Sequence, residues 1–294
     1  MSSNAYNTNS NANAITNTST TNNILALRNA HPRDQSIKFY KRGHRYEIAT
    51  DPLKKYISVT TLVHSQFPKF DADAIISKIM KSKGWAPGHK YWGLSAEEIK
   101  AQWTSSGTAA ATSGTSLHGQ IEDFMNDNRF RFEYTQKELL QEYKIMCKYD
   151  NKERGVEWDF FLKFVEDHPH LKPYRTEWMI YNEDVKIAGS VDMIYENPDG
   201  TLEIYDWKRC KEITKVNGWN ETATNPLISH LPSTNFWQYA LQLNTYKQII
   251  EAKYDKVVTK LCLVRIHPDA EAYELLEVPF LTKEITDLFQ ERLM

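Results

Sequence analysis

The sequence predicts an α/β (α+β) fold in which a central mixed β-sheet is flanked by helices. Apolar residues recur at helical spacing between residues 66 and 170, whereas runs rich in Val, Ile, Tyr and Thr recur from residue 171 to residue 278. Helices followed by a mostly contiguous set of strands are typical of this architecture. The chain has 294 residues, of which 41% are hydrophobic, so it can bury a substantial core. We therefore expect one domain over residues 35–294, mostly helical over 66–170 and sheet-rich over 171–294.

A polar segment precedes the predicted domain. Residues 2–23 consist almost wholly of Ser, Asn, Thr and Ala, and they include no acidic or basic side chain. Such a stretch buries too little apolar area to offset the entropy lost on ordering. We therefore predict that residues 1–34 form a disordered tail and that ordered structure begins near Ile37.

The first predicted elements are short. Residues 37–40 and 45–49 are expected to pair as a hairpin across a turn at residues 41–44. Ser58 is placed at the start of one helix, and Asp71 can cap the next. Further helices are predicted over residues 95–103, 116–126, 136–149 and 153–167.

The second half of the chain supplies the predicted sheet. Residues 188–195 and 201–208 are rich in Ile, Val, Tyr and Thr, and the turn-forming segment Asn197-Pro-Asp-Gly200 separates them. They are expected to form a β-hairpin at the centre of the sheet, and residues 236–246 an amphipathic helix. The remaining predicted elements are strands over 174–181, 256–266 and 272–278 and a final helix over 282–293.

Two carboxylates and a lysine lie on the predicted hairpin. Side chains alternate between the faces of a strand, so Asp206 and Lys208 share one face and Trp207 points to the other. Asp192 on the neighbouring strand can then approach Asp206. Carboxylate oxygens are the ligands that Mg²⁺ and Mn²⁺ prefer, and a nearby ammonium can neutralise a phosphate or orient water. Asp and Lys two apart are also common on exposed strands, but these strands are apolar, and buried charges normally pair or bind metal.

A predicted helix upstream adds an imidazole and a third carboxylate. Leu117, Ile121 and Phe124 form an apolar stripe, so His118 and Glu122 lie together on an adjacent face. An imidazole beside a carboxylate can be a metal ligand with its orienting partner. The alternative is a hydrogen-bonded helix histidine without a ligand role.

The helix predicted after the hairpin carries two further polar side chains. Gln242 and Tyr246 are one helical turn apart, so both can hydrogen-bond a phosphate, a base edge or the carboxylates of the hairpin. The alternative is an ordinary core-packing helix that buries Tyr246.

The order of these segments resembles that of the PD-(D/E)XK nuclease superfamily. The similarity is greater to the RecB-type exonuclease branch, which includes mitochondrial genome maintenance exonuclease-like proteins, and it covers residues 57 to 265. The matching segments are Gly114-Thr-x-Leu-His118-x-x-Ile-Glu122, Glu177, Gly189-x-x-Asp192, Asp206-x-Lys208 and Gln242-x-x-x-Tyr246. The resemblance implies a restriction-endonuclease-like core with a helical N-terminal insertion.

The resemblance also implies a role for each matching residue. It implies one or two Mg²⁺ ions, with Mn²⁺ as a substitute, held by His118, Asp192, Asp206 and the carbonyl of Trp207. Lys208 would be the catalytic lysine, acting with Asp192, Asp206, Glu122 and Glu177. The implied substrate-binding residues are Gln242, Tyr246, Thr115 and Arg209. Two positions depart from the commonest pattern, because Val191 replaces the proline of the superfamily's name and Asp206 stands where Glu is commoner.

Contacts to a nucleic acid must come from a local basic patch, because the net charge of the chain is −2. One segment interleaves lysines with aromatic residues, which suits a single strand whose phosphates pair with lysine and whose bases stack on rings. Its members are Lys78, Lys81, Lys83, Lys90, Trp85, Tyr91, Trp92 and Trp103. We assign substrate binding to Lys81 and Trp85. The alternative is a solvated helix face that its Trp residues anchor to the core.

The spacing of the cysteines and the hydropathy pattern indicate the compartment in which the protein resides. Cys147, Cys210 and Cys262 are isolated, so we expect no iron–sulfur cluster and a reducing intracellular compartment, such as the cytoplasm, nucleus or a viral factory. No apolar run reaches the length of a membrane span, and no secretory signal is visible.

Together these features predict a Mg²⁺-dependent deoxyribonuclease. We expect an exonuclease that acts on single-stranded DNA or duplex ends in replication, repair or recombination. The alternatives are an endonuclease of the same fold and a non-catalytic nucleic-acid-binding protein. The motifs do not separate exonuclease from endonuclease or DNA from RNA, and they fix neither polarity nor oligomeric state.

Overall fold

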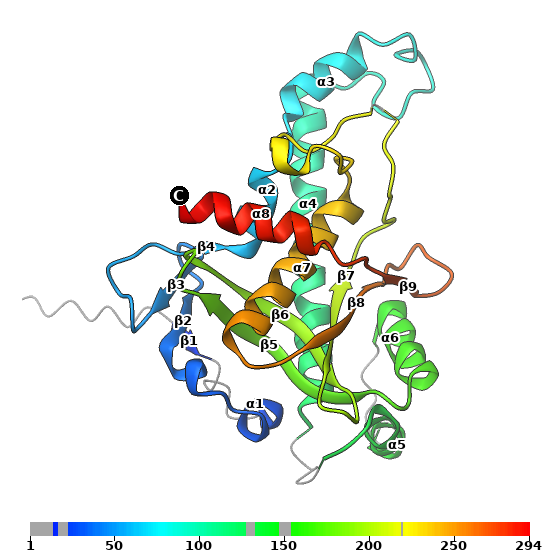
Figure 1. The fold of residues 1–294 in the computed structure, drawn as a ribbon. Coiled ribbons are helices and arrows are strands. Elements are labelled where there is room, and N and C mark those ends of the chain that lie inside the picture. The colour runs from blue at the N-terminus through cyan, green and yellow to red at the C-terminus, as the bar shows by residue number, and fades with distance from the viewer. Residues whose placement is uncertain (1–13, 17–22, 128–132, 147–153, 219) are drawn as a thin grey trace, which may run out of the picture.

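A six-stranded mixed β-sheet forms the centre of the protein (Figure 1). The computed structural model describes residues 14–16, 23–127, 133–146, 154–218 and 220–294. The strands are β4 (Ile57–Ser58), β5 (Lys172–Asn182), β6 (Ile187–Glu196), β7 (Leu202–Lys208), β8 (Val258–Arg265) and β9 (Glu274–Glu277). Their order is β4-β6-β7-β8-β9, and β5 also pairs with β6. The predicted architecture, a central mixed sheet flanked by helices, is confirmed.

The sheet is open beside the middle of β6. β5 pairs antiparallel with β6 along its whole length, from Ile187 to Glu196. On the opposite edge, the parallel pairing with β4 ends at Ala188, and the antiparallel pairing with β7 begins at Met193. Residues 189–192 therefore have no strand partner on this edge within the described part of the chain. Asp192 lies in this opening, one residue before the pairing with β7.

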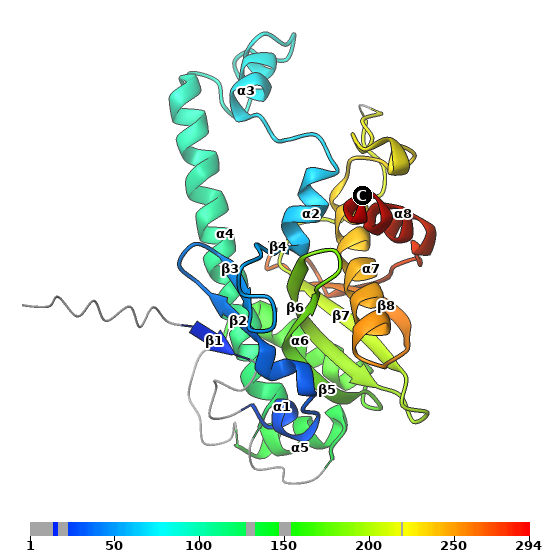
Figure 2. The same cartoon turned by 60° about the vertical axis from the view of Figure 1, so that its left-hand side comes forward.

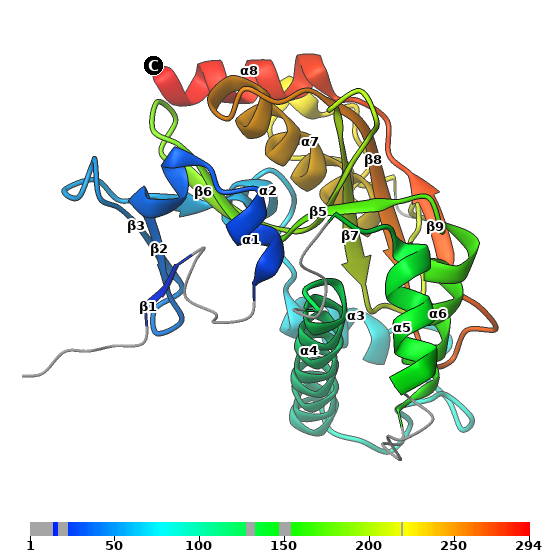
Figure 3. The same ribbon diagram turned by 90° about the horizontal axis from the view of Figure 1, so that it is seen from below.

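Helices cover both faces of the sheet (Figure 3). The larger apolar core lies beneath α2 (Val59–Ser65), α7 (Asn235–Lys253) and α8 (Thr282–Leu293). The second core lies beneath α5 (Gln136–Met146), α6 (Val156–Asp167) and the end of α4 (Ala96–Met125). The short helix η2 (Pro226–Ile228) lies in the connection between β7 and α7.

The alternation predicted for β7 is confirmed. Ile204 packs in the core beneath α7, whereas Tyr205 and Trp207 pack in the core beneath α6. Asp206 and Lys208 are therefore directed to the α7 side, away from Trp207.

One continuous helix, α4, occupies the region where two helices were predicted. Residues 104–116 are all Thr, Ser, Gly or Ala, a composition that favours a helix only weakly. The helix continues because Ser95 and Glu98 form a capping box at its start and Leu117 anchors its end in the core. Thr104 and Thr108 satisfy their hydroxyls on carbonyls four residues earlier. The outer half of α4 and α3 (Ala72–Met80) project from the domain (Figure 2).

Ordered structure begins before Ile37, so the prediction of a disordered tail up to residue 34 is wrong for its last part. α1 (Ile24–Arg28) and the 3-10 helix η1 (Pro32–Ser36) pack on the domain, because Leu25 is buried in the second core and Asp34 pairs with a buried arginine of β5. β1 (Ala14–Thr16) adds a strand to the predicted hairpin of β2 (Ile37–Tyr40) and β3 (Arg45–Ile48). The rest of the predicted tail, residues 1–13 and 17–22, lies outside the described residues.

Other local predictions agree with the structure. Ser58 caps α2, and the Asp71 carboxylate accepts a hydrogen bond from Ala74 N at the start of α3. The helix predicted over 236–246 is present as α7, which is longer than predicted and continues to Lys253. Among the described residues, no helix combines the length and the apolar character needed to cross a membrane.

Candidate metal centre

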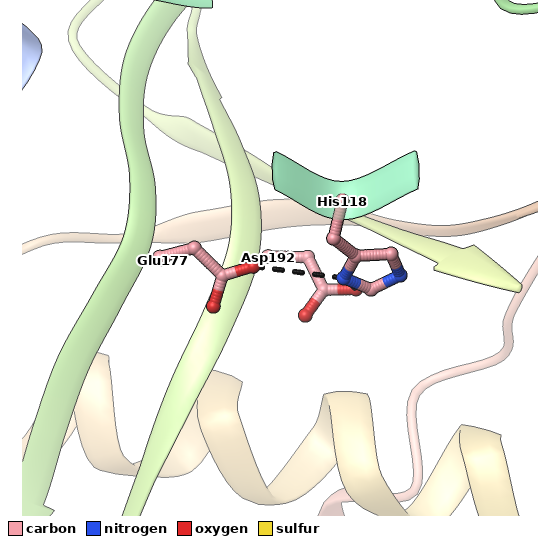
Figure 4. A group of neighbouring side chains, drawn as sticks. All are labelled: His118, Glu177 and Asp192. Atoms are coloured by element: carbon pink, nitrogen blue, oxygen red, sulfur yellow. Dashed lines mark ion pairs between the residues drawn. The ribbon is translucent and has the colours of Figure 1, made fainter. Parts of the chain in front are cut away.

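His118, Glu177 and Asp192 form a cluster at the opening in the sheet (Figure 4). They come from α4, β5 and β6, and one potential ligand atom of each lies within 4.8 Å of the others. His118 Nδ1 is 3.6 Å from Glu177 Oε1 and 3.6 Å from Asp192 Oδ2. The Glu177 and His118 side chains remain 35% and 27% exposed, so an ion or a substrate can reach the cluster from solvent.

The main chain of β7 fixes the orientation of the imidazole. His118 Nε2 lies 3.0 Å from the carbonyl oxygen of Trp207. A carbonyl can only accept, so Nε2 carries a proton, and Nδ1, which faces the two carboxylates, is the atom that would bind a cation once it has lost its own proton. The Trp207 carbonyl, expected from the resemblance as a metal ligand, is therefore positioned as the orienting partner of His118.

Glu177 holds an uncommon backbone conformation in β5. Its φ is +43°, in the left-handed region that disfavours residues with a Cβ. The neighbours Thr176 and Trp178 pair with Met193 and Val191 of β6, which places Glu177 opposite Asp192. Ser190 Oγ donates to Glu177 Oε2 at 3.1 Å. Backbone conformation and hydrogen bond together aim the carboxylate at His118.

Asp206 and Lys208 form a buried pair beside this cluster. Lys208 Nζ lies 2.5 Å from Asp206 Oδ2, and their side chains are 16% and 2% exposed. The ammonium also lies 4.5 Å from the centre of the Tyr239 ring. Asp206 is not a member of the His118–Glu177–Asp192 group. The structure thus brings Glu177 into the set of possible ligands and pairs Asp206 with the lysine.

Gln242 connects this pair to α7. Its amide lies 3.5 Å from both Lys208 Nζ and Asp206 Oδ1, and its Nε2 donates to Tyr246 Oη at 3.1 Å. The predicted pairing of Gln242 and Tyr246 on one helix face is present. Tyr246 is also 3% exposed, so it packs in the core at the same time.

The buried groups shift one another's proton affinity. Burial raises the pKa of Asp192, and burial together with Asp192 raises the pKa of Asp206 to about 6. Burial disfavours the charge of His118, but Asp192 and Glu177 outweigh it and raise its pKa to about 10. Burial also opposes the charge of Lys208, yet Asp206 and Asp192 raise its pKa above the usual value. The cluster therefore concentrates negative charge and draws positive charge to it.

The donor set of the cluster fits a divalent cation. Two carboxylates supply the oxygen ligands that Mg²⁺ and Mn²⁺ prefer, and the Nδ1 lone pair of His118 supplies a nitrogen that transition metals accept. Each of the three side chains is held by a hydrogen bond outside the group. Trp207 N donates to Asp192 Oδ2 at 3.2 Å, Ser190 donates to Glu177, and the Trp207 carbonyl accepts from His118.

Other residues predicted from the sequence are not members of the group of possible ligands. Glu122 is not the orienting partner of His118, because the Trp207 carbonyl takes that role. Asn23 Nδ2 lies 3.5 Å from Glu122 Oε1, and burial, then Glu177, raises the pKa of Glu122 to about 7. Thr115 donates to the carbonyl of Ala111 within α4, and Arg209 pairs with Glu157 at 2.5 Å. Lys81 and Trp85 lie in the connection after α3, at the projecting end of the molecule (Figure 2).

The structure adds residues that the sequence analysis did not select. Ser190 could have been found, because it lies two residues before Asp192 and so shares its strand face. Tyr239 lies one turn before Gln242 on α7 and was also within reach of a periodicity argument. Asp34 had no such signal, because its partners lie in a strand more than 140 residues away.

Comparisons with known proteins give distant structural likenesses only. No family model and no curated protein matches the chain. The crystal structure of SSO0001 is 17% identical over 81% of this chain and 75% of that chain, with a TM-score of 0.29. A solved protein from Eubacterium rectale, provisionally named an exonuclease, is 11% identical over 57% of this chain and 67% of that chain, with a TM-score of 0.30. Likenesses of this degree assign no role to any residue of the cluster.

Proposed function

We propose that this protein is a metal-dependent nuclease that hydrolyses phosphodiester bonds of DNA. One observation carries the proposal: a buried lysine paired with a carboxylate lies beside a group of one imidazole and two carboxylates on adjoining elements. A bound cation and a fixed ammonium can both stabilise the negative charge that develops during phosphodiester hydrolysis.

His118, Glu177 and Asp192 would hold the cation. When bound, a divalent cation there supplies Lewis-acid stabilisation of the charge that develops on the phosphate. The three side chains need little rearrangement for this, since Ser190 and the main chain of Trp207 already orient them.

Lys208 would act on the reacting phosphate and the attacking water. Its aliphatic stem is buried, and its ammonium is held by Asp206 and by the face of the Tyr239 ring. A fixed ammonium can orient a water molecule or neutralise phosphate charge without reorganising during the reaction. Gln242, within 3.5 Å of both charged groups, would hold their relative position or donate to a phosphate oxygen.

The proposed substrate is a DNA strand end, and the proposed mode is exonucleolytic. The support for this mode is the resemblance to RecB-type exonucleases, which rests on the types of residue at the site and on the order of their motifs along the chain. Such an activity would serve replication, repair or recombination.

The test is digestion of end-labelled single- and double-stranded DNA with Mg²⁺, with Mn²⁺, and with EDTA. We expect stepwise shortening that EDTA abolishes. Internal cuts would change the assignment to an endonuclease, and cleavage of RNA alone would change the substrate. Absence of cleavage on every substrate, with folded protein, would contradict the proposal.

Lys208→Ala gives the matched comparison. We expect it to lower the rate about 10²- to 10³-fold, as does loss of other preorganised groups that stabilise transition-state charge. Lys211→Ala removes a lysine three residues later that is 75% exposed and pairs with Asp269 at the surface, and should leave the rate unchanged. Equal rates in both variants would reject the role of Lys208.

A further inference from the structure

A group of aromatic side chains lies on the part of the molecule that projects from the domain, hereafter the arm (residues 68–113; Figures 1 and 2). Successive ring centres in the group lie 5.1 to 6.1 Å apart. The members are Phe70, Trp85, His89, Tyr91, Trp92 and Trp103. None of these residues belongs to the three apolar cores found among the described residues. Phe70 is 72% exposed and Trp92 is 45% exposed, so part of the group faces solvent.

Some of these rings hold the arm together. Trp103 Nε1 donates to Tyr91 Oη at 2.9 Å, which ties the connection after α3 to α4. Within the described part of the chain the Trp92 indole makes no such bond, and its ring contacts only that of Trp85. Its exposed face is therefore open to a ligand, whereas Trp103 supports the arm itself.

The segment between Asp73 and Glu97, which carries four of these six rings, has side-chain charge of one sign. Between Asp73 and Glu97 the chain contains no acidic residue, yet it contains four exposed lysines. These are Lys78, Lys81, Lys83 and Lys90. Lys90 Nζ also lies 5.0 Å from the centre of the Tyr91 ring. Exposed rings beside lysines complement a polyanion that carries flat apolar groups.

α4 runs from this aromatic group to the metal cluster. Trp103 and His118 are 15 residues apart on the helix, which corresponds to about 22 Å at 1.5 Å per residue. The side chains between residues 104 and 116 are all short and uncharged. No long side chain of this stretch therefore stands between the aromatic group and His118.

We propose that the arm binds single-stranded DNA and presents its end to the metal cluster. The inference rests on the proposed function and names the form of its substrate. Exposed rings can stack on the bases of a single strand, whereas a duplex hides its base faces in the stack. The lysines of the arm can pair with the phosphates of the same strand. A distance of about 22 Å accommodates about six nucleotides at the stacked spacing of about 3.4 Å, and fewer if the strand is extended.

The experiment measures binding without cleavage. A fluorescently labelled 20-nucleotide oligo(dT) is titrated with the full chain in EDTA, and fluorescence anisotropy gives Kd at several salt concentrations. We expect Trp92→Ala to raise Kd about tenfold, a loss within the range of one base–aromatic stack. We expect Lys81→Ala/Lys83→Ala to reduce the slope of log K against log salt by about 1.4, since each lost phosphate contact contributes about 0.7 for a single strand.

Matched variants separate stacking from general damage. Phe280→Ala removes an aromatic ring that is 49% exposed outside the arm, and Lys283→Ala removes a lysine of α8 whose side chain is 81% exposed. Both should bind oligo(dT) as the wild type does. Trp92→Phe keeps a stacking ring and should restore most of the affinity lost in Trp92→Ala.

The outcomes distinguish this inference from the proposed function. Wild-type affinity in both arm variants would overturn the inference even if the chain cleaves DNA. Loss of binding in the arm variants would support it even if no cleavage is found, which would reject only the nuclease. Tighter binding of oligo(U) or of duplex DNA than of oligo(dT) would overturn the assignment to single-stranded DNA.

Discussion

Gly189 lies at the opening in the sheet, where Tyr246 of α7 and Val59 of α2 pack against β6. A Cβ at this position would lie 2.7 Å from Tyr246 Cε1 and 2.9 Å from Val59 Cγ2, too close for either neighbour. The absence of a side chain therefore lets Tyr246, and with it Gln242, approach the His118–Glu177–Asp192 cluster. Steric exclusion of a Cβ thus explains why a glycine precedes Asp192 by three residues in this chain.

Gly189→Ala should destabilise the protein by about 1–3 kcal/mol, the usual cost of overpacking a core. It should also lower activity, because the displaced Tyr246 carries Gln242 away from Lys208. The control is Gly107→Ala in α4, where a Cβ meets nothing within 4 Å and should stabilise the helix by about 0.5–1 kcal/mol. Urea unfolding measures the stability of both variants. Equal stability of Gly189→Ala and the wild type would show that position 189 has room for a Cβ beside Tyr246 and Val59.

Single residues of the site were predictable to different degrees. The separation of Trp207 from Asp206 and Lys208 follows from strand alternation and is confirmed. The placement of Glu177 among the possible ligands depends on its positive φ, which no sequence pattern here signals. The Trp207 carbonyl contacts His118 because of how α4 packs on the end of β7, a tertiary contact 89 residues apart in the chain.

At the scale of elements, the segment from α1 to η1 braces β5 on both sides of Glu177. Asp34 Oδ2 lies 2.8 Å from Arg175, and Asp34 Oδ1 accepts from Trp178 Nε1 at 2.8 Å. Both charged side chains are buried, at 3% and 1% exposure. Asn126 of the α4 cap joins the same brace, since it accepts from Leu25 N and donates to Thr176 Oγ1. The elements that carry His118 and Glu177 are thus linked through the N-terminal segment.

Asp34→Asn should cost about 3–5 kcal/mol of stability, because it leaves the guanidinium of Arg175 buried without a counter-charge. The matched control is Asp73→Asn, which removes an exposed pair with Lys100 and should cost less than about 1 kcal/mol. Chemical denaturation measures both values. If the two variants lost the same small amount, the brace would not be stabilising.

The second ion pair of this segment gives stability a defined pH dependence. Burial opposes the charge of Glu183, but its hydrogen bond to Arg33 and the charge of Lys253 lower its pKa from 4.5 to about 2. A carboxyl group with a lowered folded-state pKa contributes stability that is full above pH 4.5 and is lost as the pH falls towards 2. As the pH falls from 4.5 towards 2, the free energy of unfolding of Glu183→Gln should therefore decrease less than that of the wild type. Identical acid transitions in both proteins would contradict the shift.

The elements were predicted best where local pattern and tertiary environment agree. The β6–β7 hairpin, α7 and α8 follow from periodicity and turn residues, because the two helices bury residues at helical spacing in the larger core and the hairpin buries its two faces in different cores. The middle of α4 was missed, since its Thr, Ser, Gly and Ala residues favour a helix only when both ends are fixed. α1 and η1 were missed because their order comes from contacts with β5 and α4 and not from their own composition.

At the scale of the whole molecule, the architecture has two parts with separate roles in the proposal. The two sheets and the covering helices bury three apolar cores and hold the His118–Glu177–Asp192 cluster at the opening beside β6. The arm projects from this body and carries aromatic and basic side chains outside those cores (Figure 1). Fold class was predictable from the order of helices and strands, whereas the projection of the arm depends on the unbroken α4.

In the proposed function, His118, Glu177 and Asp192 hold the cation on which hydrolysis depends. The most direct measurement is anomalous diffraction from crystals soaked in Mn²⁺, with Asp192→Asn as the comparison. We predict an anomalous peak within bonding distance of His118 Nδ1 and of the Glu177 and Asp192 carboxylates, weakened or absent in Asp192→Asn. A wild-type map with no peak at this cluster, or with Mn²⁺ bound elsewhere at full occupancy, would contradict the account.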